Sequence, residues 1–204
     1  IFEFRGVLDE DWKVDRTVYR SPDTKGMFVN FSVAAFQVAQ MSSRRKEYDE
    51  AVRWAELSYN LNPDLEFSRK YLGLYYRRAG RVEDALAHYR REIERDRANG
   101  VYWMGLASIY EDIGENLKAI EVLEEAVTVA HDHRDLFAHG FRLSATEGQR
   151  ERAVRFVRRW VEKHPEDREF RQLYDNIDKV LDSEFGPSAQ GEADSTGGPA
   201  KETD

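Results

Sequence analysis

The chain has 204 residues, of which 41% are hydrophobic, 34% are charged and 12% are aromatic. A chain of this length and composition can bury a core without cross-links, which excludes stapled mini-proteins and wholly disordered proteins. The absence of cysteine excludes disulfides, thiol nucleophiles and thiolate metal sites, and it leaves the redox compartment open. The net charge of -8 argues against generic binding to nucleic acid or anionic lipid, because both select for basic surfaces.

The first predicted helix follows an N-terminal junction segment, residues 1–31. Because the first residue is isoleucine, we expect that the chain is processed or is part of a longer one. Ser21 and Pro22 are typical of a helix start, with a capping serine before a proline in the first turn. We therefore expect a helix from about Pro22 to about Arg44. The most apolar window, residues 31–41, is too short to span a bilayer, so we expect no direct membrane insertion by this chain.

The centre of the chain, residues 32–167, is predicted to be a repeat array. Alanine recurs at a constant interval, with an apolar residue after it, and a glycine column runs alongside in which Lys46 takes the first place. The columns are Ala51, Ala85, Ala119 and Ala153, then Val52, Leu86, Ile120 and Val154, then Gly80, Gly114 and Gly148. The four predicted repeats are residues 32–65, 66–99, 100–133 and 134–167.

Each repeat is predicted to be a helical hairpin. In the second repeat, the apolar residues from Tyr71 to Tyr76 indicate a helix that stops at Gly80, because glycine readily adopts the left-handed conformation that ends helices. An amphipathic helix then starts near Val82. One hairpin cannot bury its apolar face alone, so hairpins are expected to stack into an all-α solenoid. An unrelated helical bundle is the alternative fold.

The C-terminal part is predicted to hold a capping helix and a disordered tail. Residues 168–185 place Phe170, Leu173 and Ile177 on one face, as a cap over the last apolar surface of a solenoid requires. Residues 186–204 contain no Val, Leu, Ile or aromatic residue, so they cannot bury enough surface to offset the entropy of ordering.

The repeat columns resemble the tetratricopeptide-repeat family. The resemblance rests on large residues early in the first helix, leucine followed by a small residue, tyrosines, and helix-ending prolines, which here are Trp103 and Phe137, Leu72-Gly73 and Leu106-Ala107, Tyr76 and Tyr110, and Pro63 and Pro165. It implies a right-handed α-solenoid of four hairpins plus a C-terminal capping helix. The fourth repeat departs from the family pattern at Gly140 and Phe141, where a leucine and a small residue are expected.

The open face of the first helix in each repeat is predicted to form a concave groove for a peptide segment or a neighbouring domain. The residues placed there by the register are Phe36, Gln40, Arg44, Phe67, Lys70, Leu74, Arg77, Arg78, Val101, Met104, Ser108, Glu111, Asp112, Ala138 and Arg142. Family members that bind acidic chaperone termini use Lys, Asn and Arg at set positions. Those positions here hold Phe36, Gln40, Tyr71, Val101 and Gly105, so we do not expect that activity.

The sign of the net charge alternates from negative in the first repeat to positive in the fourth. Two interpretations stay open. Either ion pairs between repeats fix their register, or the segregated charge belongs to a binding surface.

The sequence predicts no catalytic residue, cofactor, metal or nucleic-acid partner. His131, His133 and His139 lie close in sequence, and a metal site there is weighed against solvated histidines of a polar turn, which we favour. His88 and His164 are expected at the surface. No phosphate-binding loop or nucleophile motif is present, and the basic run of the fourth repeat lacks interleaved aromatic residues for base stacking.

These features predict a non-enzymatic scaffold for protein–protein interaction. The alternative comes from a second resemblance, to the junction of bacterial multi-pass membrane proteins similar to O-mannosyltransferases. It rests on Phe2, Phe4, Arg5-Gly6, Asp9, Val14-Asp15 and Asn30-Phe31. It implies a soluble C-terminal interaction domain tethered to an upstream membrane domain of a glycosyltransferase-like protein. Neither interpretation names the partner or the compartment.

Overall fold

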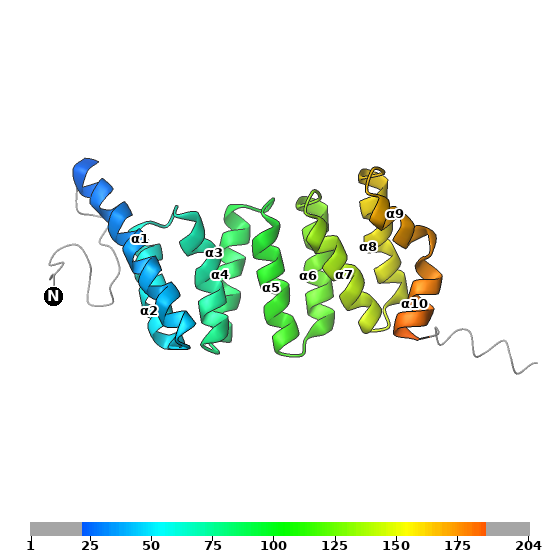
Figure 1. The fold of residues 1–204 in the computed structure, drawn as a ribbon, viewed down its shortest axis with the longest axis horizontal. Coiled ribbons are helices and arrows are strands. Elements are labelled where there is room, and N and C mark those ends of the chain that lie inside the picture. Colours follow the sequence, from blue (N-terminus) through cyan, green and yellow to red (C-terminus); the bar gives the residue numbers. More distant parts are fainter. Residues whose placement is uncertain (1–21, 187–204) are drawn as a thin grey trace, which may run out of the picture. The chain divides into compact units, whose positions relative to one another are not determined.

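The computed structural model describes residues 22–186, and over that range it consists of helices joined by turns (Figure 1). This confirms the all-helical fold class. The helices are α1 (Pro22–Arg44), α2 (Tyr48–Leu61), α3 (Glu66–Arg78), α4 (Val82–Arg95), α5 (Gly100–Asp112), α6 (Asn116–Val129), α7 (Arg134–Thr146), α8 (Arg150–Lys163), α9 (Arg168–Asp175) and α10 (Ile177–Phe185). The predicted bounds of the first helix are those of α1.

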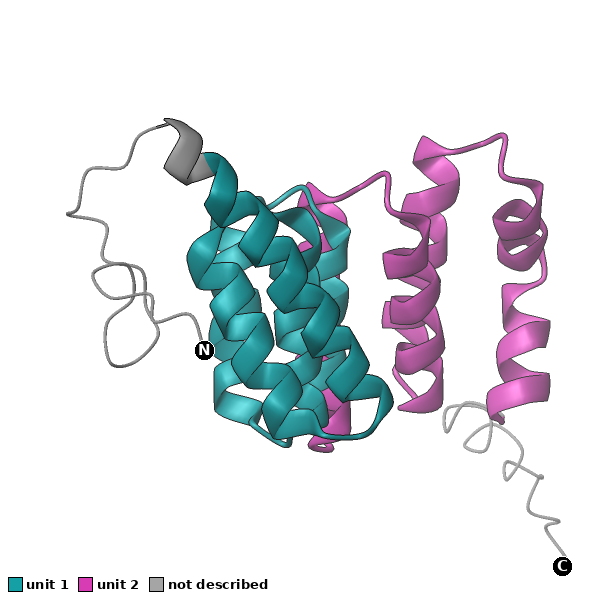
Figure 2. Ribbon diagram, turned by 60° about the vertical axis from the view of Figure 1, so that its left-hand side comes forward, with its two compact units in different colours: residues 1–109 teal, residues 110–204 magenta. Residues whose placement is uncertain are grey.

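The chain divides into two compact units within α5 (Figure 2). Unit 1 ends at Ile109 and unit 2 begins at Tyr110. We call α1, α3, α5 and α7 the A helices, and α2, α4, α6 and α8 the B helices. No described helix is long and apolar enough to cross a membrane.

Every A helix ends in the same kind of turn. Lys46, Gly80, Gly114 and Gly148 have positive φ angles of 64°, 72°, 78° and 68°. After α3, the N–H of Gly80 donates to the carbonyl of Arg77 (3.1 Å) and the N–H of Arg81 donates to the carbonyl of Tyr76 (2.9 Å). This is the Schellman pattern, in which a left-handed residue lets two free carbonyls accept bonds. The predicted role of the glycine column is confirmed.

The alanine column lies in the core of each unit. Ala51, Ala85, Ala119 and Ala153 are all fully buried. Two buried serines join α1 to α2. The Ser32 hydroxyl donates to the Ser58 carbonyl (2.9 Å), and the Ser58 hydroxyl donates to the Ser32 carbonyl (2.8 Å). Because each buried hydroxyl has a partner, these two helices approach closely without leaving a polar group unsatisfied.

Aromatic rings of the B helices pack directly against glycines of the A helices. A Cβ atom at Gly73 or at Gly105 would clash with the ring of Tyr89, and a Cβ at Gly140 would clash with the ring of Phe156. Gly140, where the fourth repeat departs from the family pattern, therefore makes room for a fully buried phenylalanine of α8.

The predicted capping helix is divided into two helices at Asn176, which is a correction to the expected continuous helix. Asn176 has φ -116° and ψ 17°, and its side-chain amide donates to the carbonyl of Gln172 (2.9 Å). That bond competes with the backbone pattern of a continuing helix. The predicted tail beyond Gly186 lies outside the described residues, as do residues 1–21 of the junction that carries the O-mannosyltransferase-like resemblance.

Candidate functional site

The predicted groove residues are mostly accessible. Phe36 is the exception, because it is 5% exposed and belongs to the core of α1, α2 and α3. Its ring lies 4.8 Å from the ring of Phe67, which is 37% exposed. Phe36 therefore supports the surface from beneath instead of forming it. The other predicted groove residues are exposed or half-buried.

We call the accessible part in unit 1 the helix-A face. Its members are Gln40, Arg44, Phe67, Lys70, Leu74, Arg77, Arg78, Val101, Met104 and Ser108. Phe67, Leu74, Val101 and Met104 supply apolar surface beside basic side chains. No acidic residue is a member, so any charge on this face is positive.

Three cations of the helix-A face lack a carboxylate. Among the described residues, no Asp or Glu lies within ion-pair distance of Arg44, Lys70 or Arg78. Arg78 donates to the Ser43 hydroxyl (2.8 Å), and Lys70 lies 5.9 Å from the centre of the Tyr71 ring. These neutral partners hold the side chains in place without neutralising their charge.

The hydroxyl of Tyr75 is influenced by the charges of two of these guanidinium groups. The ring of Tyr75 is buried beneath the face. Burial raises the pKa of the Tyr75 hydroxyl, while the positive charges of Arg78 and Arg44 oppose that rise. The charges of both arginines therefore act on the Tyr75 hydroxyl of α3.

Four arginines of unit 1 outside this face bind carboxylates instead. The pairs are Arg53 with Glu50 (3.1 Å), Arg69 with Glu92 (2.5 Å), Arg81 with Asp84 (2.7 Å), and Arg95 with Asp64. These pairs neutralise part of the positive charge of unit 1 that lies outside the helix-A face.

Charges on the A helices of unit 2 are balanced instead. Glu111 Oε1 lies 2.5 Å from His139 Nε2, and Glu111 Oε2 lies 3.7 Å from Arg142 Nη2. The predicted groove residues Glu111 and Arg142 are thus brought together through His139, which the sequence predicts in a polar turn. His139 belongs to α7. Asp112 is exposed, and Ala138 is half-buried.

The clustered histidines do not converge on a metal-binding arrangement in the described part of the chain. His131 lies 3.5 Å from Asp132, and His133 precedes the first residue of α7. A metal needs several ligands around one point, and these histidines have separate neighbours.

His88 is buried, which corrects the expectation that it lies at the surface. It is 2% exposed, and its Nε2 atom lies 2.6 Å from the carbonyl of Arg69. Burial lowers the pKa of His88. The residue lies three positions after Ala85 on the buried stripe of α4, a signal that the sequence contained. His164 is half-buried and stacks on Trp160, with ring centres 3.8 Å apart.

A buried polar cluster beside His88 joins three helices of unit 1. Glu92 of α4 is fully buried and accepts bonds from Arg69 Nε of α3 (2.5 Å) and the Tyr59 hydroxyl of α2 (2.8 Å). Burial, followed by the bond to Glu92, raises the pKa of Tyr59. Glu92 meets its partners inside the hairpin stack, so we assign the cluster to architecture and not to catalysis.

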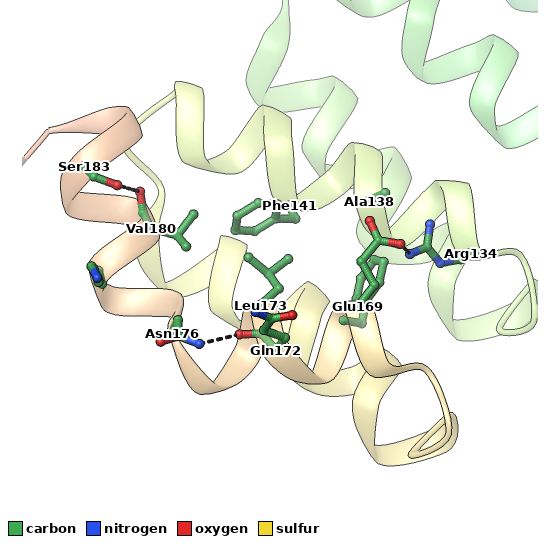
Figure 3. Close-up of a pocket in the computed structure, with 11 residues that line it drawn as sticks. Arg134, Ala138, Phe141, Glu169, Gln172, Leu173, Asn176, Val180 and Ser183 are labelled. Atoms are coloured by element: carbon green, nitrogen blue, oxygen red, sulfur yellow. Dashed lines mark hydrogen bonds and ion pairs between the residues drawn. The ribbon is translucent and has the colours of Figure 1, made fainter.

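A cleft in unit 2 was not predicted from the sequence. It lies between α7 on one side and α9 and α10 on the other, with a volume of about 600 Å³ (Figure 3). The residues around it are Arg134, Ala138, Phe141, Glu169, Phe170, Gln172, Leu173, Asn176, Lys179, Val180 and Ser183. Ala138 also belongs to the predicted groove. Asn176, at the break between α9 and α10, borders the cleft, and periodicity did not reveal this break.

The third repeat matches a known family. The family model of the tetratricopeptide repeat covers residues 101–133. This segment matches the repeat unit of that family. It lies within the predicted repeat 100–133 and includes Gly114 and Ala119 of the two columns.

Solved structures share the fold, and one of them is a tetratricopeptide-repeat protein. A tetratricopeptide-repeat protein from Parabacteroides merdae has a TM-score of 0.54 at 16% identity, over 76% of this chain and 67% of that one. A crystal structure of MamA has a TM-score of 0.52 at 15% identity, over 84% of this chain and 98% of that one. At these identities the likeness shows the fold alone. The comparison with curated proteins gave no significant sequence match.

Proposed function

We propose that this chain is a non-enzymatic interaction module whose helix-A face in unit 1 binds an acidic segment of a partner protein. The tetratricopeptide-repeat fold commonly mediates protein–protein interaction, which supports the class of function. The observation that carries the finer proposal is the set of cations without carboxylates, Arg44, Lys70 and Arg78.

Electrostatics favours this partner over a neutral one. A cation that already has a carboxylate partner gains little from a second anion, whereas Arg44 and Arg78 have no such partner among the described residues and can bind a partner carboxylate. The exposed ring of Phe67 adds apolar contact beside that charge. The chain as a whole has a net charge of -8. An acidic segment is therefore repelled by most of the surface and attracted to the positive helix-A face.

The test measures fluorescence anisotropy of a labelled peptide of alternating glutamate and serine with the full chain. We expect the double variant Arg44→Gln/Arg78→Gln to bind it about tenfold more weakly than the wild type, because two exposed charge contacts are lost. Binding should also weaken as salt concentration rises.

The matched control removes the same charge elsewhere. Arg53→Gln/Arg95→Gln neutralises two arginines of the B helices that already pair with Glu50 and Asp64, and it should change the affinity less than twofold. Equal losses in the two double variants, or equal binding of a lysine–serine peptide, would contradict the proposal.

The O-mannosyltransferase-like alternative would place this module after a membrane domain. We propose to test it on the coding sequence upstream of Ile1. Several hydrophobic spans there would support a tethered domain, and a start codon close to Ile1 would exclude it.

A further inference from the structure

The cleft of unit 2 has apolar walls from three helices. Ala138 and Phe141 of α7 face Leu173 of α9 and Val180 of α10 across it (Figure 3). Leu173 and Val180 are half-buried despite being apolar, so their surface stays accessible. A volume of about 600 Å³ is within the range of sites that bind ligands or large side chains.

The walls are held in place by contacts that the residues bordering the cleft make with their neighbours. The ring of Phe170 lies 5.7 Å from that of Trp160 and 4.7 Å from the guanidinium carbon of Arg134, which fixes α9. The rings of Phe141 and Phe185 meet edge to face at 6.4 Å and join α7 to the end of α10. The cleft is therefore framed at both α9 and α10 rather than being a loose gap.

The charges around the cleft are mostly satisfied within unit 2. Arg134 binds Asp167 (2.9 Å) and Glu169 (2.5 Å). On α10, Asp178 and Asp182 are both bound by Arg150, at 2.9 Å and 2.7 Å. Each arginine thus binds two carboxylates, so each of these two groups keeps a formal net charge of -1.

Lys179 differs from these groups. It borders the cleft, is exposed, and has no carboxylate within ion-pair distance among residues 22–186. Its neighbour Asp178 is directed to Arg150. An occupant of the cleft would thus meet apolar walls, the ion-paired Arg134 and Glu169, and one ammonium group that has no carboxylate partner among the described residues.

We propose that this cleft takes a large apolar side chain of a partner protein segment, while a neighbouring carboxylate of that segment binds Lys179. The segment that follows α10 does not supply this occupant, because residues 187–204 contain no Val, Leu, Ile, Met or aromatic residue. The inference rests on the proposed function as an interaction module, but it uses a different unit and different residues.

The test titrates an acetylated peptide, Gly-Leu-Phe-Glu-Gly, into the full chain carrying labelled methyl groups, and follows them by NMR. We expect saturable shifts of the Leu173 and Val180 methyl signals. Lys179→Gln should weaken binding about threefold, as the loss of one exposed ion pair predicts. Lys163→Gln, an exposed lysine of α8, is the matched control and should leave the affinity unchanged.

Two further arms make the result decisive. Ala138→Leu fills the cleft and should abolish the methyl shifts, with circular dichroism confirming a folded chain. The control peptide Gly-Ser-Ser-Glu-Gly, which has no large apolar side chain, should not shift the methyl signals of the wild type. Shifts confined to other methyl groups, or equal affinities of the Lys179 and Lys163 variants, would overturn the proposal. Arg44→Gln/Arg78→Gln should leave these shifts intact, so failure of the unit 1 face and failure of the cleft are distinguishable.

Discussion

At the scale of the residue, Lys46 is the exception among the turns that end the A helices. It has a φ of 64°, in the conformation that glycine adopts at the equivalent positions of the later repeats. The turn still forms, because the N–H of Glu47 donates to the carbonyl of Ser42 (2.9 Å). A side chain with a Cβ atom is strained in this conformation, so the first repeat is less stable here than the others.

Lys46→Gly should therefore stabilise the protein. We expect a gain of about 1 kcal/mol in the free energy of unfolding, measured by urea denaturation, because glycine removes the strain of the left-handed conformation. Gly114→Ala makes the reverse change at an equivalent turn with open space around it, and should cost about 1 kcal/mol. If Lys46→Gly has no effect or destabilises the chain, the turn carries no strain.

At the scale of the element, helices pack closely where a glycine faces an aromatic ring. Gly140 of α7 faces Phe156 of α8, and Gly73 and Gly105 face Tyr89. The ring fills the space that a side chain would otherwise occupy. Helix separation in each unit is thus set by pairs of residues that lie far apart in the sequence.

Gly140→Ala should destabilise the protein although alanine is the better helix former. The added methyl group meets the buried ring of Phe156, and overpacking of this kind costs about 1 to 3 kcal/mol. Thermal unfolding followed by circular dichroism measures the effect.

Gly26→Ala is the matched control, because a Cβ atom there has nothing within 4 Å and the helix gains up to about 1 kcal/mol. Phe156→Leu in the Gly140→Ala background should recover part of the loss. Equal effects of the two glycine substitutions would refute the packing argument.

At the scale of the whole molecule, resistance to acid depends on carboxylates that the fold holds ionised. Asp167 accepts bonds from Arg134 of α7 (2.9 Å), Trp160 Nε1 of α8 (2.9 Å) and the N–H of Phe170 in α9 (3.1 Å). Desolvation opposes ionisation, but these bonds outweigh it and lower the pKa of Asp167 to about 2. The ionised form thus joins three helices of unit 2.

Because the pKa of Asp167 is lower in the folded chain than in the unfolded chain, its ionised form stabilises the fold at pH values above the unfolded pKa. This contribution is lost as pH falls from about 4 to about 2. Asp167→Asn should cost about 1 to 2 kcal/mol at neutral pH, and the difference from the wild type should vanish near pH 2. Denaturant unfolding at several pH values measures it. Asp175→Asn, on the exposed surface of α9, should be nearly neutral throughout, and a pH-independent cost at Asp167 would contradict the assignment.

Several features of the fold could be read from the sequence alone. The start of α1, the turns at Gly80 and Gly114 and the burial of Ala85 follow from local constraints, namely proline at a helix start, glycine at positive φ and apolar periodicity. Such constraints act over a few residues, and the same constraints recur in each repeat.

Only the tertiary structure decided which side chains are left for a partner. It buried Phe36 and His88, directed Arg69 to Glu92, and left Lys70 and Lys179 without carboxylates among the described residues. Charge counts along the sequence could not distinguish a paired arginine from an unpaired one. The reason is physical: pairing depends on distances between helices far apart in the chain, whereas periodicity specifies only which face of each helix is turned inward.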